Sequence, residues 1–351
     1  MDLSDFVTPV GEWLKGDGPD GDIVVSTRIR LARNLADRRF VQRASPEDLS
    51  SIEAEVGGYL RERDGRFGRL YYRLSELSEV DRMVLVERHL ISREHAAADA
   101  FRAVAASDDE RLSIMINEED HLRMQVLRSG MRLAEAWREI DELDTALSGV
   151  FPFAFHRKWG YLTACPTNVG TGIRASVMLH LPALVLTREI EKVFRAMGKI
   201  NLAVRGLYGE GTQAYGDLYQ ISNQTSLGKE EETLIGNIES VVPGVVAYER
   251  KAREHILAAN RIQTEDRLSR AFGMLRSARL LSSEEGMHLL SAVRFGVHAG
   301  ILPAITTRAM NELFLLTQPA HLQKLCGRVL SASERDAERA SFVRKRLSAY
   351  V

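Results

Sequence analysis

Short strand-like segments are spread over residues 23–222 and disappear after about residue 261, and this change in pattern most constrains the fold. Before the change, apolar and polar residues alternate over short runs, which is typical of strands. After it, the pattern predicts four or so amphipathic helices, with Ser282, Thr306 and Ser333 near their expected starts. We therefore predict two domains, residues 1–258 and 259–351.

The first of these domains is expected to mix strands with helices. Residues 1–22 are rich in Gly, Asp and Pro, and they predict a loose lead-in to a first strand at 23–26. Ser45 marks a helix start, and an alanine-rich helix is expected from Ser92 to about Ala106. Further strands are expected at residues 67–74, 82–87, 112–117, 122–127, 160–164, 175–180, 201–205 and 217–222, a helix at 130–147, and a long helical region after 228.

The composition excludes several classes of protein. Of 351 residues, 45% are hydrophobic and 27% are charged, as in ordinary globular proteins. The net charge of −1 gives no reason to expect nucleic acid or a membrane surface as the main partner. Two cysteines, Cys165 and Cys326, suit a reducing compartment and are too few for a disulfide framework or a zinc site. We find no secretory signal and no apolar run of membrane-spanning length, so a cytoplasmic protein is expected.

Residues 26–33 have the sequence STRIRLAR and follow a predicted strand. In an extended chain Arg28 and Arg30 lie on the same face, which is costly unless an anion lies between them. Two parallel guanidinium groups can bind a polyphosphate through paired hydrogen bonds. Taken alone, however, the motif favours a solvated basic face with acidic neighbours.

Residues 117–123 have the sequence NEEDHLR, in which three consecutive acids stand at a strand end or turn. A cluster of carboxylates can position a cation, act as a base or bind Mg²⁺. The alternative is a charged turn without a chemical role.

Residues 165–174, with the sequence CPTNVGTGIR, form the first of two glycine-rich loops. Glycines at this spacing allow backbone amides to approach a ligand, and Arg174 follows directly. The Gly-Lys-Ser/Thr ending of a nucleotide-binding P-loop is absent. Cys165 is either a packed, inert thiol or a thiol whose pKa is lowered by nearby arginines.

Residues 205–212, with the sequence RGLYGEGT, form the second loop, where three glycines flank Glu210. This is the pattern of a loop that carries one carboxylate into a site when it closes. An ordinary surface turn explains the loop equally well when it is considered alone.

In this order, the motifs resemble the catalytic core of the phosphagen (guanidino) kinases, which include creatine kinase and arginine kinase. The resemblance covers roughly residues 23–255 and includes residues 217–223, with the sequence DLYQISN. It implies an α+β fold of the glutamine-synthetase-like type, in which helices flank an antiparallel sheet. It also implies ATP as cosubstrate, with Mg²⁺ brought by the nucleotide rather than held at a metal site of the protein.

The resemblance implies a role for each matching residue. Glu119 falls on the carboxylate that grips and deprotonates the guanidinium, Glu210 on the second carboxylate, and Cys165 on the reactive thiol. The implied nucleotide-binding residues are Ser26, Arg28, Arg30, Arg123, Arg174 and Arg205. These roles agree with the chemistry, because phosphoryl transfer depends on positioning and charge stabilisation, and a protonated guanidinium is a poor nucleophile.

The chain departs from most phosphagen kinases at both ends. Only 25 residues precede Ser26, where other members carry a helical domain that encloses a small substrate, and residues 259–351 are additional. This arrangement resembles the bacterial protein arginine kinase (McsB) family, as do residues 86–92 (VERHLIS) and 335–340 (RDAERA). The resemblance implies phosphorylation of arginines in proteins, which marks them for the ClpC–ClpP protease and inactivates the CtsR repressor. McsA as activator and a homodimer are also implied.

The same family resemblance implies that Arg335, Asp336, Arg339 and Ala340 form an allosteric pocket for phosphoarginine. An aspartate can hold the guanidinium end of this ligand while arginines hold its phosphate. Spacing alone favours charged pairs on a solvated helix. Two other functions stay open, namely a phosphagen kinase that acts on free arginine and an adaptor that recognises phosphoarginine without turnover.

Overall fold

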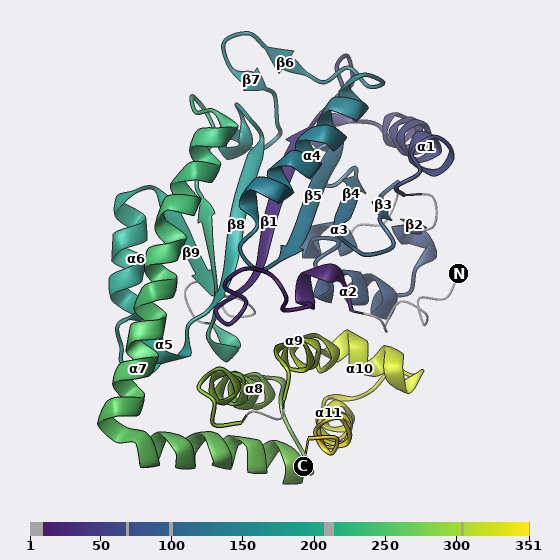
Figure 1. The fold of residues 1–351 in the computed structure, drawn as a ribbon. Helices are drawn as coiled ribbons and strands as arrows, with labels where there is room; N and C mark the ends of the chain where they lie inside the picture. The colour runs from purple at the N-terminus through teal and green to yellow at the C-terminus, as the bar shows by residue number, and fades with distance from the viewer. Residues whose placement is uncertain (1–9, 68–69, 98–100, 207–213, 303–304, 351) are drawn as a thin grey trace.

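The computed structural model describes residues 10–67, 70–97, 101–206, 214–302 and 305–350. Within them, eight strands form one antiparallel sheet in the order β2-β3-β4-β5-β1-β8-β10-β9, which confirms the expected fold class (Figure 1). A separate two-stranded hairpin extends from one end of the molecule, away from the C-terminal helices. The strands of the sheet are β1 (Val24–Arg33), β2 (Leu70–Arg73), β3 (Ala103–Ala106), β4 (Leu112–Ile116), β5 (Leu122–Ser129), β8 (Ile173–His180), β9 (Leu202–Gly206) and β10 (Leu218–Asn223), and those of the hairpin are β6 (Phe155–His156) and β7 (Gly160–Tyr161).

Helices form a layer against the sheet and a second group beneath it (Figure 1). The core against the first layer is built from buried residues of α1 (Pro46–Glu62), α4 (Leu133–Ser148), α6 (Ile190–Lys199) and α7 (Glu231–Ser277). The remaining helices are α2 (Glu79–Glu87), α3 (Arg93–Ala96), α5 (Pro182–Leu186), α8 (Ser283–His298), α9 (Thr307–Leu316), α10 (Pro319–Cys326) and α11 (Ala332–Leu347). No helix in the described ranges has an apolar stretch long enough to cross a membrane.

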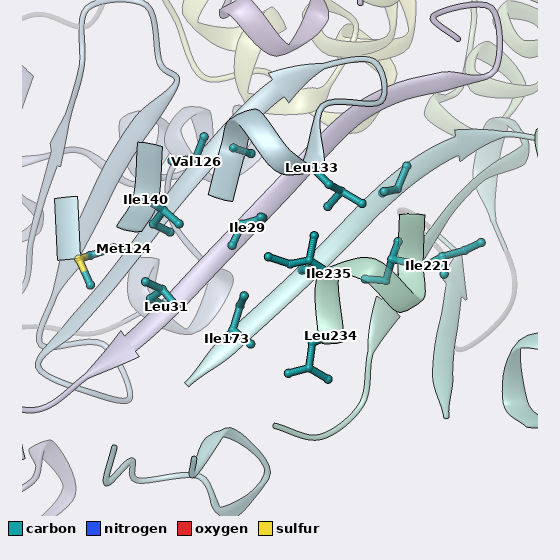
Figure 2. Close-up of a cluster of buried hydrophobic side chains, with 14 of the residues drawn as sticks. Ile29, Leu31, Met124, Val126, Leu133, Ile140, Ile173, Ile221, Leu234 and Ile235 are labelled. Carbon is teal, nitrogen blue, oxygen red and sulfur yellow. The ribbon is translucent and has the colours of Figure 1, made fainter. Parts of the chain in front are cut away.

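The central strand β1 has two chemically different faces because its residues alternate. Ile29 and Leu31 are fully buried and pack in the core with Met124, Ile173 and other apolar side chains (Figure 2). Burying an aliphatic side chain of this size contributes about 1.5–3 kcal/mol to folding. Arg28 and Arg30 lie between these residues in the sequence, so they point to the opposite face of the sheet.

Two predicted elements are wrong. Residues 82–87 lie in helix α2, whose Ser78 accepts a hydrogen bond from the Asp81 N–H, as an N-cap does. The predicted alanine-rich helix from Ser92 ends at Ala96, and Ala103–Ala106 form strand β3 instead. All four residues of β3 are buried between β2 and β4, so tertiary packing outweighs the helix preference of alanine here.

The N-terminal segment is not a loose lead-in throughout. Trp13 and Leu14 are 3% and 2% exposed, respectively, and belong to a second apolar core. This core also contains Leu290 of α8, Met310 of α9 and Val343 of α11. The beginning and the end of the described chain therefore share one core.

Helix α7 carries the chain through the expected domain boundary near residue 258 without a loop. Asn260 has non-helical angles (φ −145°, ψ 52°), and the helix bends sharply there (Figure 1). The segment before the bend packs with the first core, and Leu268, Ala271 and Leu275 after it are buried. The change in sequence pattern thus corresponds to a bend within a helix.

Arg33 fastens the end of β1 to three other parts of the fold. Its guanidinium donates to the Asp144 carboxylate of α4 at 2.7 Å and to the Thr171 carbonyl at 2.8 Å. It also lies 3.5 Å from the centroid of the Tyr161 ring in the hairpin. Arg33 is only 1% exposed, so water cannot replace these partners.

We expect Arg33→Ala to lower the free energy of unfolding by roughly 3–5 kcal/mol, because Asp144 would be left as a buried, unpaired carboxylate. Urea denaturation followed by circular dichroism measures this change. The matched control is Arg270→Ala, which breaks the exposed Arg270–Asp266 pair and should cost less than about 1 kcal/mol. Equal losses for the two variants would contradict the assigned role of Arg33.

Candidate active site

A cleft of about 1960 Å³ lies on the face of the sheet opposite the core residues Ile29 and Leu31. Its walls come from the sheet, from α2, from the β4–β5 turn and from the C-terminal helices. The arginines that line it are Arg28, Arg30, Arg93, Arg102, Arg123, Arg174, Arg205 and Arg335. Five of the six residues predicted to bind nucleotide are therefore in one cleft.

Strand register explains why these arginines meet. Arg30 of β1 is directly opposite Arg174 of β8, and Arg205 of β9 is directly opposite Gln220 of β10. Residues opposite each other in antiparallel strands share a face of the sheet. Arginines from four strands that are far apart in the sequence, β1, β5, β8 and β9, therefore converge because the sheet order β5-β1-β8-β10-β9 brings these strands together.

The arginines are held close together at an electrostatic cost. Burial, followed by the charges of Arg123 and Arg174, lowers the pKa of Arg28 to about 10. Burial and the same neighbours, together with Arg28, place the pKa of Arg30 well below its ordinary value. The buried Nε atoms of Arg30 and Arg174 have no hydrogen-bond partner among the described residues. Crowded, incompletely paired guanidinium groups are the arrangement that a polyanion such as a triphosphate would fit.

Polar residues orient two of these guanidinium groups. Arg28 donates to the Gln220 side-chain oxygen at 2.8 Å, and Arg174 donates to the Ser222 hydroxyl at 3.2 Å. Both partners come from β10, on the same face as the arginines. Gln220 was not among the predicted site residues, although its alternation with buried Ile221 is the signal that would have placed it on the polar face.

The three consecutive acids occupy the tight turn between β4 and β5, which Asn117 enters with a positive φ of 59°. The Glu118 carboxylate accepts three hydrogen bonds, from Arg123 at 2.7 Å, from the Ser92 hydroxyl at 2.6 Å and from the Glu119 N–H at 2.9 Å. Burial works to raise the pKa of Glu118, but the charge of Arg123 and these hydrogen bonds lower it to about 2. Glu118 is thus a permanent anion that positions Arg123.

Glu119 differs from its neighbour because it lines the cleft and forms no ion pair with another described residue. Burial and the negative charges of Asp120 and Glu118 raise its pKa, and Arg123 only partly opposes them. A carboxylate with a raised pKa is a stronger base than an ordinary glutamate. Among the acids of the turn, Glu119 therefore combines access to the cleft with enhanced basicity.

Asn34, which the sequence analysis missed, holds the acidic turn in place. Its side chain donates to Asp120 at 2.6 Å and to the Leu162 carbonyl at 3.1 Å, and it accepts from the His121 N–H at 2.9 Å. It is 1% exposed. Asp120 also accepts from the Ala164 N–H at 2.7 Å, so the turn is tied to the segment that leads to Cys165. An isolated asparagine after a strand carries no sequence signal for such a role.

Of the predicted catalytic and nucleotide-binding residues that the structure describes, Ser26 and Cys165 do not line the cleft. Ser26 is 2% exposed within β1. Cys165 precedes a short turn of helix, and its Sγ lies 3.1 Å from the Thr167 hydroxyl. Glu210 lies outside the described residues. Cys165 is nevertheless tied to the acidic turn, because the N–H of the neighbouring Ala164 donates a hydrogen bond to the Asp120 carboxylate.

The four C-terminal residues predicted to bind phosphoarginine lie together on α11 but differ in environment. Arg335 lines the cleft and donates to the Leu330 carbonyl at 2.8 Å. Arg339 is buried, pairs with Asp336 at 2.7 Å and also donates to the Thr317 and Leu281 carbonyls. Ala340 is fully buried in the second core.

Solved structures of phosphagen kinases share this fold. The chain superposes on a duplicated taurocyamine kinase from Schistosoma mansoni, solved with transition-state analogue components, with a TM-score of 0.61 and 25% identity. That match covers 74% of this chain and 39% of the duplicated one. A lombricine kinase matches with a TM-score of 0.58 and 24% identity over 69% of this chain and 71% of its own, which shows the shared fold.

Sequence comparisons extend the likeness to the C-terminal helices. Residues 51–252 match the family model of the ATP:guanido phosphotransferase C-terminal catalytic domain, and residues 261–350 match that of the protein-arginine kinase McsB C-terminal domain. The protein-arginine kinase of Symbiobacterium thermophilum is 52% identical over 96% of both chains. That of Halothermothrix orenii is 47% identical over 99% of this chain and 100% of its own. The chain therefore belongs to the protein-arginine kinase family.

Proposed function

We propose that the protein transfers the γ-phosphoryl group of ATP to the guanidinium of arginine side chains in protein substrates. The observation that carries the proposal is that five arginines converge on one sheet face, in the same cleft as a carboxylate with a raised pKa. The names of the relatives, which are kinases of protein arginine, support the choice of acceptor.

Arg28, Arg30, Arg123, Arg174 and Arg205 are proposed to hold the triphosphate. Their guanidinium groups bind phosphate oxygens in pairs and neutralise charge as the phosphoryl group moves. Mg²⁺ would be held through nucleotide oxygens, because Glu118 and Asp120 already accept hydrogen bonds from protein groups. Ser26 is proposed to support this site from β1 rather than from the cleft wall.

Glu119 is proposed to grip the acceptor guanidinium and to take its proton. The freed nitrogen lone pair attacks the γ-phosphorus as the bond to the leaving ADP oxygen breaks, which yields phosphoarginine and ADP. Glu210 is proposed as the second carboxylate and Cys165 as the reactive thiol beside the acceptor guanidinium. The contact between Ala164 and Asp120 supports a place for Cys165 near Glu119.

The cellular setting is proposed from the family. The phosphorylated arginines would direct damaged proteins to ClpC–ClpP in the cytoplasm and would inactivate the CtsR repressor, with McsA as activator. A homodimer through the C-terminal helices is part of the same proposal.

Arg335, Asp336, Arg339 and Ala340 are proposed to form the allosteric phosphoarginine pocket. The solvent-facing candidate for the phosphate is Arg335, because Arg339 already binds two carbonyls and Asp336. The Asp336 carboxylate, which is 35% exposed, is available to a second guanidinium. Ala340 would serve as packed support for the helix.

We expect Glu119→Gln to lower kcat on an unfolded arginine-rich protein by about 10²–10⁴-fold, because the proton acceptor is lost while the shape is kept. Acid-labile phosphate on arginine, localised by mass spectrometry, is the readout, with free L-arginine in a parallel reaction. Glu47→Gln, an exposed acid of α1, is the control and should keep full activity. If the wild-type protein phosphorylates only free arginine, the proposed protein acceptor is wrong.

The pH dependence should report the raised pKa of Glu119. The carboxylate becomes protonated at a higher pH than an ordinary glutamate, whose pKa is about 4.3, so activity falls as the pH drops through this raised value. Asp120→Asn removes one of the charges that raise the pKa and should move the acid limb of kcat/KM to lower pH. If the acid limb of kcat/KM stays in place or moves to higher pH in this variant, Glu119 is not the titrating group.

We expect Arg30→Met to stabilise the nucleotide-free protein by at least ~1 kcal/mol, because a buried cation beside three others is replaced by an apolar side chain. The same variant should lose most of the rise in melting temperature that Mg²⁺·ATP produces in the wild type. Thermal denaturation with and without nucleotide measures both effects, with exposed Arg279→Met as the control. A destabilised variant that still responds to ATP would refute the assignment of Arg30.

A further inference from the structure

Two basic segments leave the fold side by side next to the acidic turn. One is the loop of residues 37–43 after β1, and the other is the β6–β7 hairpin. Both start at a short antiparallel bridge between Leu35 and Phe153, where the Ala36 N–H donates to the Pro152 carbonyl at 2.7 Å. The hairpin then projects beyond the end of the sheet, at the opposite end of the molecule from α8–α11 (Figure 1).

Each segment is attached to the turn that carries Glu119. The Gln42 side chain donates to the Glu119 carbonyl at 2.8 Å, and His121 Nε2 donates to the Arg39 carbonyl at 2.9 Å. The hairpin reaches the same turn through Leu162, whose carbonyl accepts from Asn34. Gln42 of the first segment therefore lines the cleft beside Glu119, and both segments keep a defined position relative to the acidic turn.

The exposed charges of these segments are almost all positive. We use the term basic rim for Arg39, Arg43, Arg157 and Lys158, which are exposed. Among the described residues, none of these four forms an ion pair, whereas Arg38 is paired with Glu55 at 3.1 Å. Asp37 is the single acid of residues 37–43, and residues 153–162 contain none. The rim is thus a local positive patch on a chain of net charge −1.

Exposed aromatic rings accompany the charges. Phe155 is 60% exposed and Trp159 is 44% exposed. Phe155 packs edge-on against Tyr161 at 5.3 Å, and Tyr161 lies beneath the buried Arg33. Because the hairpin is anchored in this way, its rings would lose little conformational freedom when they bind a partner, which favours their use as contact residues.

We propose that the basic rim, together with Phe155 and Trp159, docks an extended segment of the protein substrate that carries acidic and aromatic or aliphatic residues next to the target arginine. The inference rests on the proposed function, because it assumes that the acceptor arginine reaches Glu119. The positive rim would repel a segment rich in lysine and arginine and attract one with acidic residues. It would thus select target arginines by the charge of the residues next to them. Exposed rings suit unfolded segments, whose apolar side chains are accessible.

The test compares two unfolded peptides that contain one arginine, one with glutamate and leucine neighbours and one with lysine and leucine neighbours. We expect the wild-type kcat/KM to be about 10-fold higher for the acidic peptide, mostly through KM. The double variant Arg157→Glu/Lys158→Glu should lose this preference or reverse it. Its kcat on the short acceptor acetyl-arginine-amide should be unchanged, because neither residue lines the cleft.

The matched control is Lys199→Glu/Lys251→Glu, which makes the same charge change at exposed positions on α6 and α7 and should keep the wild-type preference. Trp159→Ala should raise KM for both peptides about equally, whereas Ile262→Ala, at a 78% exposed residue of α7, should not. If the wild type labels both peptides equally, or the rim and control variants behave alike, the docking proposal is wrong while the proposed function stands. If the wild type labels no peptide at all, the proposed function itself fails.

Discussion

Repulsion among neighbouring guanidinium groups is the constraint on which the cleft depends. β1 and β8 can present Arg28, Arg30 and Arg174 side by side because the opposite face of the same strands is buried in the apolar core. That burial offsets the unfavourable energy of the crowded charges. Glu118 fixes only Arg123, so the remaining positive charge is directed toward whatever anion enters. The ligand-free fold therefore already carries a site that fits a polyphosphate.

On the acceptor side, hydrogen bonds between uncharged groups help to hold the acidic turn in place. Asn34 and His121 are both buried and connect the acidic turn to the end of β1. His121 accepts from the Leu35 N–H at 3.0 Å and donates to the Arg39 carbonyl, so it serves as a neutral structural residue. Because these bonds carry no net charge, they leave the raised pKa of Glu119 to be set by burial and the neighbouring acids.

The sequence predicted the parts of the site that follow strand alternation and compact motifs. Arg28, Arg30 and Glu119 of the STRIRLAR and NEEDHLR segments do line one cleft, although each segment taken alone also fitted a solvated face or a charged turn, and only the family resemblance joined them. Asn34 was missed because its role depends on a contact with Asp120, 86 positions away, which no local pattern encodes. For Gln220, strand alternation indicates the polar face, but its contact with Arg28, 192 positions away, has no local signal. The same limitation explains the error at Ala103–Ala106, where a strand forms because its neighbours β2 and β4 are present.

The shared core of Trp13 and Leu14 with α8, α9 and α11 has a consequence for biosynthesis. Trp13 and Leu14 are synthesised before α8, α9 and α11, so the part of their burial that these helices supply has to wait until residues 283–347 have been made. The arginine face and the strands that carry it can pair earlier, while the cleft still lacks its C-terminal wall. A nascent or truncated chain would therefore expose Trp13 and the underside of the sheet, and chaperones would have reason to bind there until synthesis is complete.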